Sequence, residues 1–136
     1  MRSVIVRKSK TQRDCFRFFL LLPLSALLLS IFYRRYLLLL LFFPLALIFT
    51  IILIYVESWQ IVFSSSSVIR KVFFVKVGHY SYSSLNDACL LYSLTDHEYV
   101  VLSFANNKCI RFRMKDENAS KALKVIRSHK SVRRKI

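Results

Sequence analysis

Two long hydrophobic runs, residues 18–33 and 36–56, dominate the distribution of apolar and polar positions along the chain, and only two arginines separate them. Because an α-helix rises about 1.5 Å per residue, about 20 apolar residues cross the roughly 30 Å hydrocarbon core of a bilayer. The second run reaches this length without a charge. The first run is shorter and spans if Phe16 joins it, if Arg17 snorkels to the interface, or if the bilayer thins locally. The pattern predicts a transmembrane helical hairpin.

From residue 57 onward, apolar and polar residues alternate, as expected for strands with one buried face. The stretch 68–77 is rich in Val, Ile and Phe, and Gly78 is its expected break. Further strands are expected at 88–94, 99–104 and 109–114, with turns at 95–97 and 105–108. Asn106 and Asn107 suit the second turn because asparagine tolerates the positive φ of tight hairpins. These segments predict an antiparallel meander.

An amphipathic helix is expected over residues 116–129. Asp116 is a suitable N-cap, and Glu117 complements the positive end of the helix dipole. Apolar residues then recur at helical spacing, so one side of the helix should pack on the sheet. The expected core residues are Phe73, Leu90, Val101, Phe112 and Ile126.

Together these elements define an α+β membrane protein, with an N-terminal transmembrane hairpin, a small antiparallel β-sheet domain and a C-terminal helix that caps the sheet. The expected divisions are a basic cytosolic arm over 1–17, two spans within 18–56 and a β-rich cytosolic domain over 57–136. A domain of roughly 80 residues is just large enough to bury a core of its own.

The charge of the chain is strongly basic, with 22 Lys and Arg against 7 Asp and Glu. Six basic residues precede the first run, and half of all the basic residues lie between 108 and 135. Because basic flanks stay preferentially in the cytoplasm, both termini are expected there, in a multi-pass protein of the cell (inner) membrane. Arg34 and Arg35, in the turn between the spans, oppose this orientation but are outnumbered.

Two other topologies are open. The first run could be a secretory signal, although no A-x-A-like cleavage site follows it and the second run begins at once. Alternatively, the first run only dips into the membrane, which leaves one true span and places the charged domain outside.

The strongest surface signal is a stripe of basic residues, formed by Arg111, Arg113, Lys115, Lys121, Lys124 and the tail 133–135. We expect four of them to bind an acidic cytosolic protein or anionic lipid headgroups, namely Arg111, Arg113, Lys121 and Lys124. Nucleic acid is not an expected partner, since no nucleic-acid-binding motif accompanies the charge. A solvated basic face without a partner is the simplest alternative.

Residues for chemistry are sparse. No ionisable residue lies within either hydrophobic run, which disfavours transport. Three cysteines and three histidines are scattered without metal-ligand spacing, so neither a metal nor another cofactor is expected. No nucleophile with an oxyanion partner is recognisable, so no catalytic residue and no enzymatic activity are expected.

The order of the parts resembles small bacterial membrane proteins in which a two-helix hairpin carries a cytosolic pleckstrin-homology-like (PH-like) domain. This resemblance rests on 68–114 for the strands and 116–129 for the helix. The layout is also similar to that of the CptA-like inner-membrane toxins, which have two spans and a β-rich cytosolic end. The resemblance implies a non-enzymatic module that recruits or regulates partners at the membrane. The alternative is a membrane-permeabilising toxin or viroporin, whose spans act as a homo-oligomer in the lipid bilayer.

Overall fold

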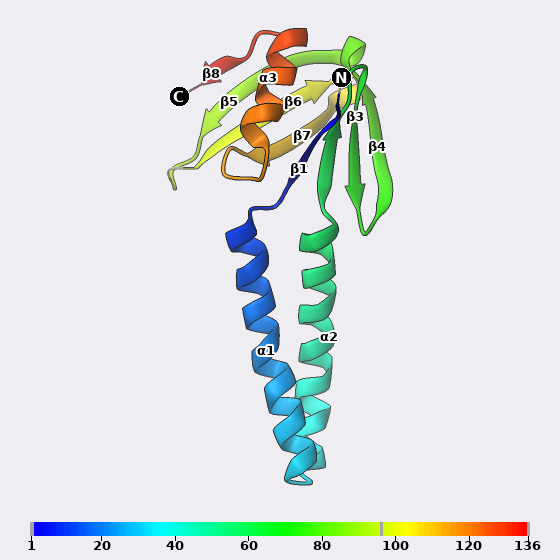
Figure 1. The fold of residues 1–136 in the computed structure, drawn as a ribbon, viewed down its shortest axis with the longest axis vertical. Helices are drawn as coiled ribbons and strands as arrows, with labels where there is room; N and C mark the ends of the chain where they lie inside the picture. Colours follow the sequence, from blue (N-terminus) through cyan, green and yellow to red (C-terminus); the bar gives the residue numbers. More distant parts are fainter. Residues whose placement is uncertain (1, 96, 136) are drawn as a thin grey trace. The chain divides into compact units, whose positions relative to one another are not determined.

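The computed structural model describes residues 2–95 and 97–135. They form two compact units: a pair of helices over Lys10–Ser58, and a β-rich domain built from the segments on both sides of this pair. The arrangement is an α+β layout, with two long apolar helices, antiparallel sheets and a C-terminal helix (Figure 1). The expected α+β class is therefore confirmed at this level.

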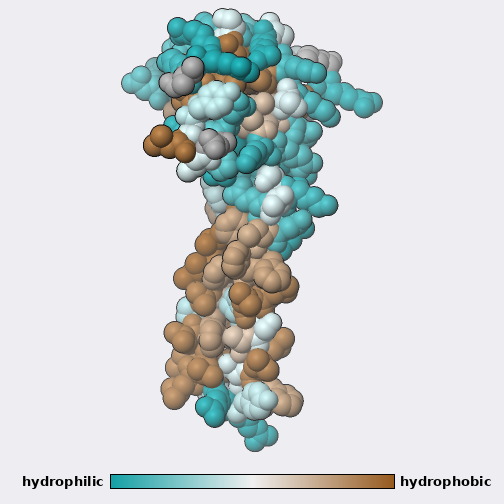
Figure 2. Space-filling model, turned by 90° about the vertical axis from the view of Figure 1, so that its left-hand side faces the viewer, coloured by the Kyte–Doolittle hydropathy of each residue, from teal (hydrophilic) through white to brown (hydrophobic). Residues whose placement is uncertain are grey.

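The two helices have equal length. Helix α1 covers Lys10–Phe32 and helix α2 covers Tyr36–Ser58, each of 23 residues, and they pack against each other. Both are long and apolar enough to cross a membrane. Their large apolar side chains are mostly exposed, and hydrophobic residues cover most of the visible face of this pair (Figure 2). Such a surface is suited to lipid.

The turn between the helices is made without glycine. Arg34 adopts a positive φ of 53°, and the Arg35 N–H donates a 2.9 Å hydrogen bond to the Ser30 carbonyl. This is the bond with which a left-handed residue commonly closes a helix C-terminus. Arg34 thus takes the position that glycine usually occupies.

The N-terminal segment differs from the predicted arm. Val4–Arg7 forms strand β1, and α1 begins at Lys10, well before the hydrophobic run. Strand β1 pairs antiparallel with β2 (Gln60–Phe63), and the side chain of Val6 is fully buried. A strand of four residues gives little periodicity of its own, and its partner lies on the other side of the helices in sequence.

The first sheet has the order β1-β2-β3-β4. The predicted single strand 68–77 is in fact a hairpin of β3 (Ser67–Val72) and β4 (Val75–Ser81), which turns at Phe73 and Phe74. Gly78 does not break the strand but lies within β4. A Cβ atom at Gly78 would lie 2.6 Å from the Tyr80 hydroxyl, so the Tyr80 side chain occupies the space beside this glycine.

The second sheet has the order β7-β6-β5-β8. A short 3₁₀ turn, η1 (Tyr82–Ser84), leads into it. Its strands are β5 (Leu85–Tyr92), β6 (Glu98–Phe104), β7 (Lys108–Arg113) and β8 (Arg133–Lys135). Strands β5, β6 and β7 form the expected meander, and the predicted turn 95–97 includes Asp96, which lies outside the described residues.

The turn before β7 and the last strand of this sheet compare differently with the sequence predictions. The turn η2 (Ala105–Asn107) has positive φ at Asn106 and Asn107, as predicted. Strand β8 was not predicted: the basic tail pairs in parallel with β5.

Helix α3 covers Ala119–His129. Its N-cap is Asn118, in the left-handed conformation, and not the predicted Asp116. Asp116 is instead 5% exposed, and its Oδ2 accepts a 2.9 Å hydrogen bond from the Arg113 N–H. The carboxylate therefore fixes the turn between β7 and α3.

One hydrophobic core joins the inner faces of both sheets to α3. The Phe63 and Phe112 rings meet edge to face across it, with 5.7 Å between their centroids. Leu90, Phe112 and Ile126 are buried, as predicted. Phe73 is wrong as a core residue because it lies in an exposed turn, and Val101 is only half-buried, on the outer face.

The pairing of β1 predicts unequal effects of two neighbouring substitutions. Val6→Asp places an unpaired charge in the core and should lower the free energy of unfolding by about 3 kcal/mol or more. Ile5→Asp, on the other face of the strand, should cost only about 1 kcal/mol. The readout is guanidinium unfolding in detergent, followed by the fluorescence of the single tryptophan, Trp59, which is 4% exposed. Equal effects would contradict the register of β1.

Candidate functional site

The structure divides the four predicted binding residues between two surfaces. Arg111 and Arg113 lie in β7, where Ile110 and Phe112 point into the core. Because neighbouring side chains of a strand point to opposite faces, both arginines lie on the outer face of the second sheet.

Lys121 and Lys124 are exposed on α3, whose other side packs into the core. The core that α3 shares with the inner face of the second sheet therefore separates the two lysines from the two arginines. The single basic surface inferred from the sequence is not formed by these four residues.

The strand register places further residues beside Arg111 and Arg113. Two rows cross the outer face of the second sheet, each with one residue from β8, β5, β6 and β7. The first row is Lys135, Leu91, Tyr99 and Arg113. The second row is Arg133, Cys89, Val101 and Arg111. Each begins and ends with a basic residue and has a mainly apolar centre. We call these eight residues the outer-sheet surface.

Several contacts order this surface. The Arg113 guanidinium lies 5.8 Å from the centre of the Tyr99 ring, within the range of a cation–π interaction. A shallow pocket of about 230 Å³ lies beside it, lined by Arg111, Tyr99, Leu91, Tyr92 and Ser93. The surface therefore combines an arginine, a tyrosine ring and a small hollow.

Asp87 is an acidic residue next to this surface. Its Oδ1 lies 3.0 Å from Nη2 of Arg133, and its Oδ2 accepts a hydrogen bond from the Cys89 thiol at a distance of 3.2 Å. The hydrogen bonds from Cys89 and Arg133 hold the pKa of Asp87 below its usual range. Asp87 thus partly neutralises Arg133, whereas the structure records no ion pair for Arg111 or Lys135 within the residues that it describes.

Cys89 is 7% exposed, and its pKa is shifted in the direction opposite to that of Asp87. Burial raises the pKa of its thiol, and the hydrogen bond to Asp87 adds to this effect because the carboxylate disfavours the thiolate. Cys15 and Cys109 are exposed free cysteines. Cys89 is thus a protected thiol at the centre of the surface.

The histidines give no metal centre in the described part of the chain, where no three His, Cys, Asp or Glu side chains gather as ligands. His129, at the end of α3, instead stacks on Tyr82, with ring centroids 3.9 Å apart and 9° between the planes. Burial raises the pKa of Tyr82 to about 12, and its hydroxyl donates to the Ser64 carbonyl. This pair joins α3 to η1.

Comparisons of the chain with protein-family models, with curated proteins and with solved structures find no match.

Sequence reasoning included the tail in one basic stripe with Arg111 and Arg113, but it did not predict that Arg133 and Lys135 lie in rows with them on one sheet. They are adjacent to the meander only through the parallel pairing of β8 with β5. Three consecutive basic residues have little preference for a strand, so nothing local marks them as one. The signal available in the sequence was the two-residue spacing of Arg133 and Lys135, which places both side chains on one face if the tail is a strand.

The environment of Cys89 predicts slow alkylation. In a Cys15→Ser, Cys109→Ser background, Cys89 should react with iodoacetamide with a pH midpoint above that of an ordinary cysteine, because both burial and Asp87 disfavour its thiolate. Asp87→Asn should move this midpoint downward, since it removes the carboxylate. Rates measured from neutral pH to pH 11 check both statements. An unchanged or higher midpoint in the Asp87→Asn protein would contradict the assigned contact.

Proposed function

We propose that the chain is a non-enzymatic interaction or regulatory protein, held in the cell (inner) membrane by α1 and α2, that binds an acidic segment of a cytosolic protein. The outer-sheet surface is the observation that carries this proposal. The other ligand expected from the sequence, anionic lipid headgroups, is the competing assignment for this surface.

The pairing of β1 with β2 supports a hairpin with both ends on one side of a membrane. The segments before α1 and after α2 belong to one compact domain, so they occupy one compartment. This domain holds most of the Lys and Arg of the chain, whereas the turn between the helices holds Arg34 and Arg35. Because basic segments are retained in the cytoplasm, we assign both termini to that side.

The β-rich domain also supports a binding role. We infer a PH-like fold from two sheets, antiparallel except for the β5–β8 pair, that share a core closed by a C-terminal helix. Such a sandwich is a rigid scaffold, and strands hold side chains more precisely than loops do. The function therefore depends on what the outer surfaces of the sandwich present.

The spacing of charges on the outer-sheet surface is suited to an extended acidic segment. Neighbouring strands lie about 4.8 Å apart, so the basic residues at the two ends of a row are about 14 Å apart. A segment laid across the sheet would place acidic side chains at both edges and apolar ones over Leu91 and Val101. Charge complementarity of this kind sets specificity and increases the association rate.

Reversal of charge on two faces tests this assignment. The double variant Arg111→Glu, Lys135→Glu alters the outer-sheet surface, and Lys121→Glu, Lys124→Glu makes the same charge change on α3. The probe is a fluorescent peptide of nine residues in which Glu and Leu alternate at every second position and Ser fills the positions between them, so that Glu and Leu face the sheet together when the peptide is extended. The protein is held in nanodiscs of neutral lipid. The first variant should bind about tenfold more weakly, about 1.4 kcal/mol, while the second keeps nearly wild-type affinity.

Two results would contradict the proposal. Equal losses in the two variants would mean that net charge alone attracts the peptide. Binding of the wild-type domain to phosphatidylglycerol vesicles but not to the peptide, lost in the first variant, would assign the surface to lipid headgroups.

The topology predicts that Ser3 and Ser131, both exposed, share one compartment. Ser3→Cys and Ser131→Cys, in a background without native cysteines, should both be protected from an impermeant thiol reagent in intact cells and should both react after lysis. Reaction of Ser131→Cys alone from outside would refute the hairpin, and reaction of both would place the domain outside the cell.

A further inference from the structure

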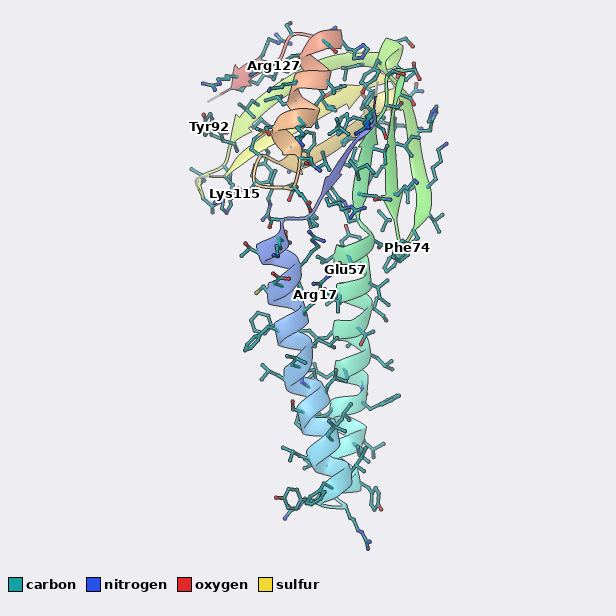
Figure 3. All side chains as sticks on the ribbon, in the orientation of Figure 1. Arg17, Glu57, Phe74, Tyr92, Lys115 and Arg127 are labelled. Carbon is teal, nitrogen blue, oxygen red and sulfur yellow. The ribbon has the colours of Figure 1, made fainter. Side chains whose placement is uncertain are left out.

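The tip of the β3–β4 hairpin is an exposed aromatic pair. Phe73 and Phe74 form the turn, with 44% and 76% of their surfaces exposed, and Phe74 projects from the end of the hairpin (Figure 3). Val75 and Val77, which follow in β4, are 63% and 61% exposed. Four large apolar side chains therefore lie together on one protruding hairpin.

The backbone of this turn does not suit phenylalanine. Val72 pairs with Val75, so the loop has two residues, and Phe73 and Phe74 both have positive φ, of 51° and 62°. Two-residue turns with positive φ at both positions favour Asn-Gly, because a bulky side chain is strained in this conformation. Strained residues with exposed side chains are often found at functional sites. The aromatic pair is thus not explained by the needs of the turn.

The register fixes which end of the first sheet carries the tip. Arg7, Gln60, Lys71 and Lys76 are successive partners across β1, β2, β3 and β4. Arg7 is the last residue of β1 before the chain enters α1, and Gln60 is the first residue of β2 after the chain leaves α2. The hairpin tip therefore projects from the same edge of the sheet at which the chain passes into and out of the helices.

Two positive charges also lie side by side near the tip. Lys71 and Lys76 are direct cross-strand partners, and like charges in this position repel each other. Arg7 lies in the same line of paired residues. An anionic lipid surface would relieve the repulsion, because Lys and Arg near such a surface are attracted to its headgroups.

We propose that Phe73 and Phe74 insert into the headgroup region of the bilayer that holds α1 and α2, with Lys71 and Lys76 against anionic headgroups. This inference rests on the membrane anchoring proposed above. Exposed aromatic residues flanked by basic ones are the usual composition of interfacial anchors. The tip is then a second attachment of the domain to the membrane, in addition to the two chain connections.

The test places an environment-sensitive fluorophore at one of three cysteines in an otherwise cysteine-free full chain. The sites are Phe74→Cys at the tip, Ser83→Cys beyond the opposite end of β4, and Ile48→Cys in the middle of α2. The chain is reconstituted in vesicles of equal parts phosphatidylcholine and phosphatidylglycerol, with nitroxide-labelled lipids as quenchers at a shallow or a deep position.

The shallow quencher should remove more than half of the emission at Phe74→Cys and leave Ser83→Cys unchanged. The deep quencher should act on Ile48→Cys. Quenching at Ile48→Cys without quenching at Phe74→Cys overturns the tip inference and leaves the membrane anchor intact. Absence of quenching at Ile48→Cys overturns the proposed membrane anchoring itself.

A tip variant separates membrane contact from a structural role. Phe73→Asn, Phe74→Gly suits the turn, so the guanidinium midpoint should be unchanged or higher, while shallow quenching of a probe at Val75→Cys should be lost. Phe73→Trp, Phe74→Trp should retain that quenching. A lower midpoint with quenching retained in the Asn-Gly protein would show that the phenylalanines serve only the fold.

Discussion

The pairing of β1 with β2 is the constraint on which the rest of the molecule depends. Arg7 and Gln60 are neighbours in one sheet, so the intervening segment must leave and return at almost the same place. Two antiparallel helices of equal length, 23 residues each, satisfy this condition. Within the helical unit, Glu57 near the end of α2 pairs with Arg17 of α1, and Figure 3 shows these side chains facing each other.

The same pairing determines what each edge and face of the β-rich domain can do. Near the chain connections, the Lys8 ammonium lies 4.1 Å from the centre of the Trp59 ring, and burial lowers the pKa of Lys8. This contact joins the outgoing and the returning segments. Because α3 and the inner faces of the sheets share one core, the basic residues that remain outside are divided between the outer-sheet surface, α3 and the hairpin edge. The basic charge of the chain is thus distributed over several distinct surfaces.

Residues that follow a simple period were predictable. The hydrophobic runs gave both helices, and the alternation in β5, β6 and β7 gave the meander, with Asn106 and Asn107 in its turn. The hairpin at Phe73 and Phe74 was not predictable, because neither residue favours a positive φ. Asp116 looked like a helix cap, yet it bonds the Arg113 N–H, since the chain must turn sharply between β7 and α3.

The sequence by itself determined the helical pair, the α+β class and the excess of basic charge, because hydrophobic length and local periodicity are properties of contiguous residues. Only the tertiary structure decided that Val4–Arg7 joins the sheet, that Arg133 and Lys135 lie in rows with Arg111 and Arg113, and that Lys121 and Lys124 do not. The physical reason is that strand pairing between distant segments is selected by the burial of a shared core. No local pattern records which strands will meet across it.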